Sequence, residues 1–535
     1  MVGGRAGDTG RQGYEVHSHV KLPVLSASLD IGLPEVGEAW EIFDARRFAS
    51  LPRLALNNPT IGGIPLMTDP RLIPEPTIFI LYGGTGDLAH RLVLPAFYRL
   101  AIAGLLPPEW RLVGNGRGDV SHEDFQERVR ESLEEFGPKP SEGPWNEVRS
   151  RLRFAGGGFE TSDPGSLLEV LAEAEQELGG TPQRIHYMAV PPVAFGPLTE
   201  AIGAHGLVER SRVVYEKPFG TSMETFRDLD HVAHATFEES QIYRIDHFLG
   251  KEATQDVHVV RFGNGLFAGA WDASHIDNVQ IDVPETLDVA GRASFYEATG
   301  AILDMLVTHL FQLTAEVAME PPHCLEPECL AEAREKVIGC FRPLTPDDVV
   351  VGQYQGYRAI DSVPDDSRTE TFVAAKVWVD NDRWKGVPFL LRTGKCLTES
   401  HQRVSVVFKD PVPGLAGQPA AASVLGFELS GDGRITLTLV VKEPGPALTL
   451  SAATIALPLG TGFHTPSLPA YSRLLHDVLI GDRSLFTRPD GLEHVWKVAD
   501  GILHDKPEPI IYPRGSWGPD EASDLVSPRR WLLSE

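Results

Sequence analysis

The chain of 535 residues has little cysteine, no long apolar run and a shortage of basic charge. Its 4 cysteines are too few and too irregularly placed for a disulfide framework, so we expect a reducing compartment. No run of about eighteen apolar residues occurs, and the N-terminus lacks a basic region followed by an apolar stretch. We therefore expect a cytoplasmic protein without a membrane span.

The charge balance argues against two classes of partner. The chain has 48 basic and 74 acidic residues, which gives a formal net charge of -26. Such a field repels polyanions, so neither nucleic acid nor an anionic membrane is expected as the main partner. An anionic ligand would need a local basic pocket.

Two of the cysteines, Cys324 and Cys329, lie near His323 in a segment rich in proline and glutamate, and the others are Cys340 and Cys396. His323, Cys324 and Cys329 suggest a metal site, but they supply at most three ligands at a loose spacing. We therefore predict no metal site.

Length and composition indicate a folded protein with more than one domain. Apolar residues make up 42% of the chain and charged residues 23%, close to average globular usage. Residues 1–72 form a Gly- and Pro-rich extension whose role the sequence does not reveal. We place one domain at residues 73–246 and a larger one at residues 247–535.

Strands and helices alternate in the first domain. Strands are expected at Thr77–Tyr82, Trp110–Val113, Leu152–Phe154, Arg184–Val190 and Ser211–Tyr215, with helices at Asp87–Ala103, from Ser121 and at Pro164–Leu178. This order is typical of a doubly wound parallel α/β sheet, which we expect to end near residue 245.

The pattern changes after residue 252 to strand-like alternation. Strands are expected at Val257–Phe262, Val279–Val283, Thr371–Val379, Val404–Phe408 and Arg434–Val441. A long helix is expected over Thr299–Met319, residues 465–505 are predicted to be helical, and Tyr512–Pro519 is predicted to be a loop. The second domain is therefore expected to be α+β, built on a mainly antiparallel sheet.

A glycine turn follows the first strand. Gly84, Gly86 and Ala89 fit the dinucleotide fingerprint in its G-x-G-x-x-A form, between a strand and its helix. The chemistry needs a tight turn, a close approach of the backbone to a pyrophosphate, and a helix N-terminus that faces the anion. The alternative is a glycine turn that binds nothing.

The end of the second strand indicates which coenzyme the domain prefers. NAD enzymes commonly place an acidic residue there to hold the ribose 2′-hydroxyl, whereas this chain has Arg117 and no acid before Asp119. Because a guanidinium suits a 2′-phosphate, we favour NADP, with Thr85 as a second contact. The alternative is a solvated surface arginine.

Lys217 and Pro218 follow a late parallel strand, where open α/β sheets place ligands. A lysine at this position can hold an anion or a hydroxyl, and a cis Pro218 would direct it into the cleft. An ordinary turn at the strand end is the alternative.

The stretch Tyr243–Glu252 mixes charged and apolar residues. Arg244, Asp246, His247 and Lys251 alternate with apolar neighbours, as residues that line a cleft often do. The alternative is a surface turn closed by an Arg–Asp pair.

His309 stands among leucines in the middle of the long expected helix. A lone histidine on an apolar helix is more often structural than catalytic. Asp304, five positions earlier, would not lie on quite the same face of an α-helix.

From about residue 75 onward the chain resembles the glucose-6-phosphate dehydrogenase family. The motifs that carry the resemblance occur in order at residues 83–89, 216–220, 244–252, 304–309, 317–322, 383–389 and 392–395. The resemblance implies oxidation of the C1 hydroxyl of glucose 6-phosphate with reduction of NADP, or sometimes NAD, in a homodimer or homotetramer. It also implies that residues 247–535 bind substrate and form the subunit contacts.

The resemblance assigns roles by position. His309 would be the general base and Asp246 the carboxylate that orients it. Substrate contacts are implied for Lys217, His247, Lys251, Glu285, Asp304 and Lys395, with His247 and Lys251 on the phosphate and Glu285 and Asp304 on sugar hydroxyls. Cofactor contacts are expected from Gly83, Gly84, Thr85, Gly86, Asp87, Leu88, Arg117 and Lys217.

At the expected phosphate contacts, two positions depart from the family pattern. Phe248 stands where the family usually has tyrosine, and Ser400 stands where it usually has a basic residue. A charge-assisted hydrogen bond contributes about 1.5–3 kcal/mol, so we expect weak binding of glucose 6-phosphate or a related sugar as the substrate. His401 or Arg403 could replace Ser400.

Two other functions are compatible with parts of the sequence. Dehydrogenases of the glucose–fructose oxidoreductase and inositol dehydrogenase group are similar in carrying a Glu-Lys-Pro turn after a nucleotide-binding sheet. A catalytically silent NADP-binding paralogue would be expected to lose the Asp246 and His309 pair, and this chain keeps both.

Overall fold

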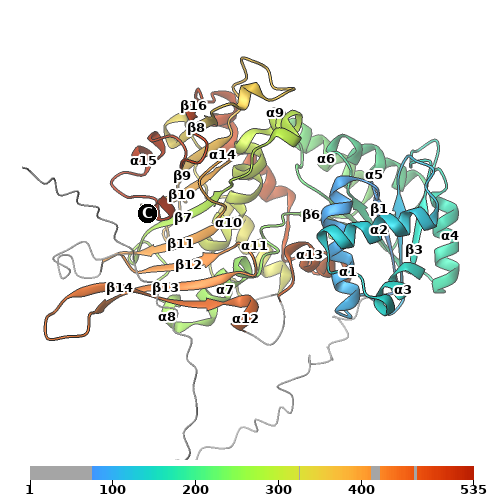
Figure 1. Ribbon diagram of the computed structural model, residues 1–535, viewed down its shortest axis with the longest axis horizontal. Coiled ribbons are helices and arrows are strands. Elements are labelled where there is room, and N and C mark those ends of the chain that lie inside the picture. The colour runs from blue at the N-terminus through green and yellow to red at the C-terminus, as the bar shows by residue number, and fades with distance from the viewer. Residues whose placement is uncertain (1–74, 325, 411–421, 463–466, 535) are drawn as a thin grey trace, which may run out of the picture. The chain divides into compact units, whose positions relative to one another are not determined.

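The computed structural model describes residues 75–324, 326–410, 422–462 and 467–534. All of these residues belong to one compact unit that begins at Gly62. The predicted extension at residues 1–72 lies outside the described residues. The described part contains two sheets, and most of the helices and strands are labelled in Figure 1.

The first sheet is the predicted doubly wound parallel sheet. Its parallel strands are β1 (Thr77–Tyr82), β2 (Trp110–Asn115), β3 (Leu152–Ala155), β4 (Gln183–Met188), β5 (Ser211–Tyr215) and β6 (Ile242–Ile245). The order across the sheet is β15-β6-β5-β4-β1-β2-β3, and only the edge strand β15 (Phe486–Thr487) pairs antiparallel. Apart from β15, this is the 3-2-1-4-5-6 order of a Rossmann fold.

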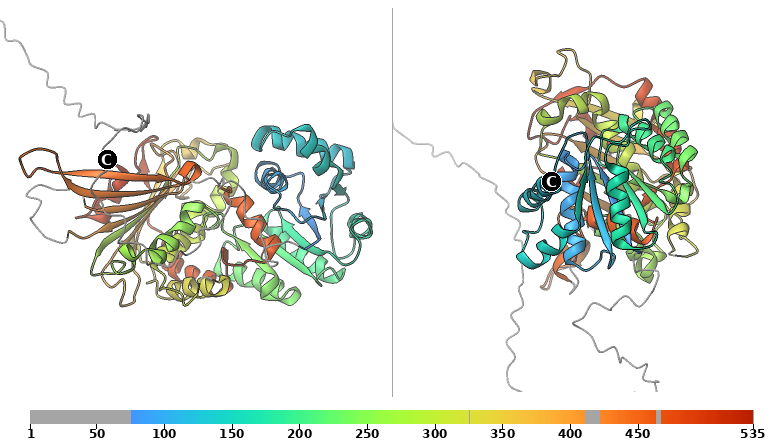
Figure 2. Two further views of the ribbon diagram at one scale, coloured as in Figure 1. Left: turned by 90° about the horizontal axis from the view of Figure 1, so that it is seen from below. Right: turned by 90° about the vertical axis from the view of Figure 1, so that its right-hand side faces the viewer.

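Helices cover both faces of this sheet, as the right-hand view of Figure 2 shows. They are η2 (Ala89–Val93), α1 (Leu94–Ile102), α2 (His122–Phe136), α3 (Glu142–Ser150), α4 (Leu167–Leu178), α5 (Phe195–Ala204) and α6 (Met223–Thr236). Alternate residues of β1 pack in different cores: Ile78 and Ile80 with α4 and α5, and Phe79 and Leu81 with α1 to α3. Both faces of the strand are therefore buried, which explains its unbroken apolar run.

The second sheet has nine strands and is mainly antiparallel, as predicted. They are β7 (Ile276–Pro284), β8 (Val349–Tyr354), β9 (Phe372–Val377), β10 (Phe389–Gly394), β11 (Arg403–Phe408), β12 (Val424–Glu428), β13 (Arg434–Lys442), β14 (Leu450–Pro458) and β16 (Ile510–Tyr512). The order is β14-β13-β12-β11-β7-β10-β9-β8-β16, with parallel pairing only between β7 and β10 and between β8 and β16. The β13–β14 hairpin extends beyond its neighbours (Figure 1).

Further helices accompany this sheet. They are α7 (Glu252–Gly263), α8 (Gly265–Ala268), α9 (Ala293–Ala301), the π-helix η6 (Ile302–Leu310), α10 (Phe311–Ala318), α11 (Pro327–Ile338), α12 (Leu459–Gly462), α13 (Ala470–Ile480), α14 (Pro489–His504) and α15 (Glu521–Val526). The prediction of helices between residues 465 and 505 is confirmed for α13 and α14.

The expected strand at Val257–Phe262 is wrong, because this segment lies within helix α7. The buried residues of α7 include Ala253, Val257 and Arg261, which are spaced four apart as on one face of a helix. The valines of this segment have high strand propensity, but tertiary packing overrides it.

One long apolar helical segment, Ala290–Ala318, forms a central part of the core. By length and composition it could cross a membrane, but 83% of its most apolar stretch is buried inside the protein. Its α9 part bends at Gly300, where φ is +59° and a Cβ would lie 2.2 Å from Glu370 Oε1. Only glycine suits this bend, and the π-helix η6 follows it directly.

A disulfide joins Cys324 to Cys329, which the number and placement of the cysteines did not predict. Cys340 and Cys396 are free. A single disulfide between cysteines five positions apart does not form a disulfide framework. It does show that these two sulfur atoms lie within bonding distance.

Candidate active site

The glycine turn lies between β1 and its helix. Gly83 has φ +74°, and a Cβ there would lie 2.3 Å from the carbonyl oxygen of Ala189. A Cβ at Gly84 would lie 3.0 Å from the Cα of Gly114. Both glycines are therefore required by the close approach of neighbouring strands, and the turn leaves Thr85 exposed at the carboxyl edge of the sheet. Asp87 and Leu88 begin the helix, exposed and half-buried respectively.

A cavity of about 700 Å³ lies beside the ends of β2 and β3. Exposed Arg117 lines it together with Ser121, His122 and Ser166. Asn115, at the end of β2, donates its side-chain amide to backbone oxygens of Ala155 and Gly158 at 3.1 Å. Arg117 therefore offers a cation to a phosphate in this cavity, which four carboxylates also line: Asp119, Glu123, Glu169 and Glu173.

His309 and Asp246 form a buried pair. Nδ1 of His309 lies 2.6 Å from Oδ1 of Asp246, and the two side chains are 0% and 1% exposed. Asp246 immediately follows β6, and the backbone N–H of Phe248 also donates to its Oδ1 at 2.9 Å. The carboxylate therefore fixes the imidazole with its proton on Nδ1, which leaves Nε2 as a proton acceptor.

The protonation of the pair follows from its burial. Burial raises the pKa of Asp246 to about 6, and burial together with the nearby Lys217 holds the pKa of His309 well below its usual value. Nε2 of His309 and Oδ2 of Asp246 are buried with no hydrogen-bond partner among the described residues. A neutral imidazole with a free lone pair is the form that a general base requires.

Lys217 contacts the π-helix that carries His309. Its Nζ lies 3.0 Å from Oδ1 and 3.2 Å from the backbone oxygen of Asp304. Although burial alone would raise the pKa of Asp304, Lys217 and Lys395 lower it to about 2. The Lys217–Pro218 peptide is cis, as expected.

Asp304 and His309 lie closer to the same face of their helix than they would in an α-helix. Residues Ile302–Leu310 form a π-helix with i→i+5 hydrogen bonds, so residues five apart lie about one turn apart. The expectation from α-helical spacing is therefore wrong for this pair.

His247, Phe248 and Lys251 surround the other side of the histidine. The His247 ring meets the His309 ring edge to face at 4.6 Å between centroids, and Phe248 packs on His309 at 4.7 Å. Nζ of Lys251 lies 4.8 Å from the Phe248 ring centre, and it donates to Gln402 Oε1 at 2.7 Å. Burial lowers the pKa of Lys251 to about 8.

A cavity of about 200 Å³ opens beside this group, lined by His247, Lys251, Leu429 and Asp432 among others. Burial, reinforced by the neighbouring His309 and Lys217, holds the pKa of His247 well below its usual value. At neutral pH, Lys251 is therefore the cation of this cavity and His247 is a neutral hydrogen-bonding group.

Glu285 and Lys395 form the remaining part of the site. Their side chains pair at 2.6 Å, and the charge of Lys395 contributes, with those of Lys217 and Lys251, to the low pKa of His309. The structure thus brings all the predicted substrate residues around the His309–Asp246 pair, with Glu285 joined through Lys395. The glycine turn and Arg117 lie at the carboxyl edge of the first sheet.

His401 and Arg403, the residues expected to compensate for Ser400, differ in their positions. The Ser400 hydroxyl accepts from the backbone N–H of Thr286 at 2.9 Å and so anchors the chain next to Glu285. Val404 packs in the same core as residues of η6, and alternation along β11 therefore directs Arg403 to the opposite face of the sheet. The expectation that Arg403 could replace a basic residue at position 400 is not supported, while His401 lies 3.8 Å from Glu428.

Sequence reasoning missed several residues of the site. Tyr471 stacks on His247 at 6.1 Å between centroids and donates to Glu216 Oε2 at 3.5 Å. The hydroxyl of Tyr296 is buried with no partner among the described residues, within range of the charges of Asp304 and Glu285. No spacing in the sequence marks these tyrosines: Tyr471 reaches the site from α13, far along the chain, and Tyr296 lies in α9, before the bend that separates it from His309.

A Rossmann sheet with its glycine turn, joined to a buried His–Asp pair among three lysines, defines the class of dinucleotide-dependent dehydrogenases. Residues 80–256 match the family model described as glucose-6-phosphate dehydrogenase, NAD binding domain. Residues 258–532 match glucose-6-phosphate dehydrogenase, C-terminal domain. The chain belongs to the glucose-6-phosphate dehydrogenase family.

Individual relatives align with this chain along nearly their whole length. The chain is 38% identical over 487 residues to glucose-6-phosphate 1-dehydrogenase of Mycolicibacterium smegmatis, a match that covers 85% of this chain and 97% of the relative. A crystal structure of the enzyme from Mycobacterium avium aligns with a TM-score of 0.76 at 32% identity, covering 86% and 98% of the two chains. A glucose-6-phosphate dehydrogenase in complex with glucose 6-phosphate aligns with a TM-score of 0.80 at 30% identity, covering 87% and 99%.

Proposed function

We propose that the protein oxidises the C1 hydroxyl of glucose 6-phosphate to 6-phosphogluconolactone and transfers the hydride to NADP, the first step of the oxidative pentose phosphate pathway. The buried contact between His309 and Asp246 carries this proposal, because it supplies an oriented neutral base beside three lysines. A relative with 30% identity and the same fold is described in complex with glucose 6-phosphate.

His309 acts as the general base. Its Nε2 takes the proton of the C1 hydroxyl, and the carboxylate of Asp246 stabilises the imidazolium that forms. The Nδ1 contact at 2.6 Å holds the ring in one orientation throughout. NADP, when bound, supplies the hydride acceptor.

The surrounding side chains position the sugar phosphate. Lys251 and His247 hold the phosphate at the cavity that they line. The ion pairs Lys217–Asp304 and Lys395–Glu285 already place donors and acceptors in fixed positions for sugar hydroxyls. These preformed pairs reduce the entropy lost when substrate is ordered for reaction.

The glycine turn and the cavity beside β2 hold the cofactor. The turn formed by Gly83 to Gly86 lets the pyrophosphate approach the backbone, and Asp87 and Leu88 open the helix behind it. Arg117 binds the 2′-phosphate, so NADP is preferred and NAD is a poorer substrate. Lys217, which follows β5 and contacts Asp304, serves both the cofactor and the sugar.

This protein binds the substrate phosphate more weakly than a family member with the usual residues at positions 248 and 400. Phe248 is packed against His309 and carries no hydroxyl, and the Ser400 hydroxyl is held by Thr286. Two of the four usual phosphate contacts are therefore lost, and Lys251 carries most of the attraction.

The proposal also includes the roles of the two domains, the oligomeric state and the cellular compartment. Residues 73–246 bind the dinucleotide, and residues 247–535 bind the sugar phosphate and form the contacts of a homodimer or homotetramer. The enzyme works in the cytoplasm on a small-molecule substrate, without nucleic acid or membrane as a partner.

Steady-state kinetics with a matched substrate panel test the proposal. Glucose 6-phosphate, galactose 6-phosphate and free glucose are each offered with NADP and with NAD, while absorbance of the reduced coenzyme is followed. Glucose 6-phosphate with NADP is expected to give the highest kcat/KM, with a KM above the micromolar range. A micromolar KM contradicts weak phosphate binding, and equal kcat/KM for free glucose contradicts the proposed substrate.

A further inference from the structure

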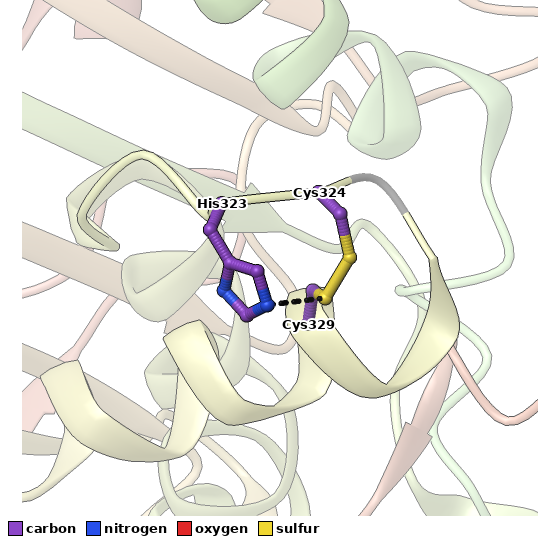
Figure 3. A group of neighbouring side chains, drawn as sticks. All are labelled: His323, Cys324 and Cys329. Atoms are coloured by element: carbon purple, nitrogen blue, oxygen red, sulfur yellow. Dashed lines mark hydrogen bonds between the residues drawn. A yellow bond between two sulfur atoms is a disulfide. The ribbon is translucent and has the colours of Figure 1, made fainter.

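A histidine and two cysteines form a compact group in the turn between α10 and α11 (Figure 3). Cys324 and Cys329 are joined by a disulfide, and Nε2 of His323 lies 3.3 Å from the sulfur of Cys329. The ligand atoms of all three residues lie within 4.8 Å of one another. His323 is exposed, so the group is open to solvent on one side.

The disulfide contributes little to the stability of the fold. Its cysteines are separated by five positions, and closing so short a loop removes little entropy from the unfolded chain. Helix α11 is held independently, because its buried Arg334 pairs with Glu316 of α10 at 2.7 Å and donates to the backbone oxygen of Ser484. These contacts do not depend on the disulfide, so we expect the helix to keep its place when the disulfide opens.

Although the sequence spacing alone predicts no metal site here, we propose that the reduced form of this turn is a binding site for a zinc ion, with Cys324, Cys329 and His323 as ligands. A dithiol reductant transfers two electrons and two protons to the disulfide, which yields two thiols and the cyclic disulfide of the reductant. Zinc then displaces the two thiol protons, and the neutral Nε2 of His323 donates its lone pair.

The geometry is close to that of a tetrahedral site. Zinc binds sulfur at about 2.3 Å and imidazole nitrogen at about 2.1 Å, so the two atoms lie roughly 3.5 Å apart around a tetrahedral ion. The His323–Cys329 distance of 3.3 Å already approaches this value. The two bonded sulfur atoms must separate, and the fourth position is left to water on the exposed side.

The donor set also fits zinc by charge and type. Two thiolates neutralise the charge of the ion, and sulfur with imidazole nitrogen is a combination that zinc prefers over oxygen-seeking cations. Cys329 lies in the first turn of α11, a helix of 12 residues, where the helix N-terminus stabilises a thiolate. The disulfide and the zinc site are therefore alternative states of the same two sulfur atoms.

Cobalt as a spectroscopic substitute for zinc tests the proposal on the full chain. The protein is prepared oxidised and, separately, reduced with a phosphine that carries no thiol, and each form is titrated with Co²⁺. The reduced form is expected to bind one Co²⁺ with a thiolate-to-metal absorption band, which Zn²⁺ then displaces. The oxidised form is expected to show no such band.

Substitutions identify the ligands. Cys324→Ser and Cys329→Ser should each abolish or strongly reduce the band, and His323→Ala should weaken Co²⁺ binding at least about tenfold. Cys340→Ser, at a free cysteine, and His504→Ala, at an exposed histidine, are matched controls that should leave it unchanged. Since His323 is exposed, its variant keeps its fold, which circular dichroism verifies.

Three results would overturn the proposal. They are the absence of a thiolate band in the reduced chain, the same band in the oxidised chain, and a band that survives Cys329→Ser. The thiolate band also excludes a contribution from Asp246, His247 and His309, which contain no sulfur.

Discussion

Nδ1 of His309 and Oδ1 of Asp246 lie 2.6 Å apart in a fully buried contact, although 63 positions separate the two residues in the chain. The contact joins the loop after β6 to the π-helix η6, and so connects the dinucleotide-binding sheet to the core helix of the second sheet. Its geometry makes Nε2 of His309 the only ring nitrogen left to accept a proton.

Replacing Asp246 by asparagine should lower kcat by about 10²- to 10⁴-fold, because the amide neither fixes the imidazole tautomer nor balances its positive charge. The dissociation constant for NADP should stay the same, since Asp246 lies outside the glycine turn. Rapid single-turnover kinetics and fluorescence titration measure the two effects. Asp228→Asn, on the exposed side of α6, is the matched control. An unchanged kcat in Asp246→Asn would remove the orienting role.

Lys251→Met should raise the KM for glucose 6-phosphate by about 10- to 150-fold, the equivalent of one charge-assisted hydrogen bond of about 1.5–3 kcal/mol. At saturating substrate kcat should change little, because Lys251 binds a part of the sugar that does not react. Lys497→Met, on the surface of α14, should leave KM unaltered. A lost kcat with constant KM would instead place Lys251 at the reaction centre.

The same lysine predicts an alkaline limit in the pH profile. Burial lowers the pKa of Lys251 to about 8, so its ammonium loses its charge as pH rises through this value. Because kcat/KM reports the free enzyme, it should fall above about pH 8 in the native enzyme. This alkaline fall in kcat/KM should be absent from Lys251→Met. A fall of equal size in the variant would assign it to another group.

Arg117→Ala should weaken NADP binding by about 10- to 150-fold and leave NAD binding nearly unchanged, because only NADP carries the 2′-phosphate. Isothermal titration with each coenzyme measures the difference directly. Arg128→Ala, exposed on α2, serves as the control for a general loss of positive charge. If both coenzymes weaken equally, Arg117 does not discriminate between them.

The buried pair of Glu316 and Arg334 predicts a loss of stability in acid. Although burial alone would raise the pKa of Glu316, Arg334 and His258 lower it to about 2, below the usual 4.5. The unfolded chain therefore binds more protons than the native protein between these values, and stability falls as pH falls from about 4.5 to 2. The full effect of this carboxylate is about 3 kcal/mol.

Glu316→Gln tests this source of acid sensitivity. The variant should unfold at a lower temperature at pH 7, by the equivalent of about 3–5 kcal/mol, because Arg334 is left buried without its counter-charge. Its melting temperature should then depend less on pH between 5 and 3 than that of the native protein. Scanning calorimetry across this range would contradict the account if both proteins showed the same dependence.

Local patterns predicted much of the fold because they report burial directly. Strand β1 is a continuous apolar run because both of its faces are covered, and the glycine turn after it is visible because close strand contacts forbid a Cβ. The helix α7 was mistaken for a strand because its valines favour strands locally. Only its packing on the core, which no short window of sequence contains, decides for a helix.

The site was less predictable, because it depends on contacts between distant segments. Lys217 could be nominated from its place at a strand end, but nothing in the spacing joins His309 to Asp246. The relation of Asp304 to His309 was misjudged because the π-helix changes the residues that share a face. Tyr471 carried no signal at all.

Replacing His309 by asparagine is the most direct test of the account. Asparagine keeps a smaller polar side chain that is not basic, so hydride transfer from glucose 6-phosphate to NADP should fall by about 10²- to 10⁴-fold. Binding of NADP and of glucose 6-phosphate, measured by calorimetry on the same preparation, should be retained. Turnover at the native rate with both ligands bound would contradict the assignment of His309 as the base.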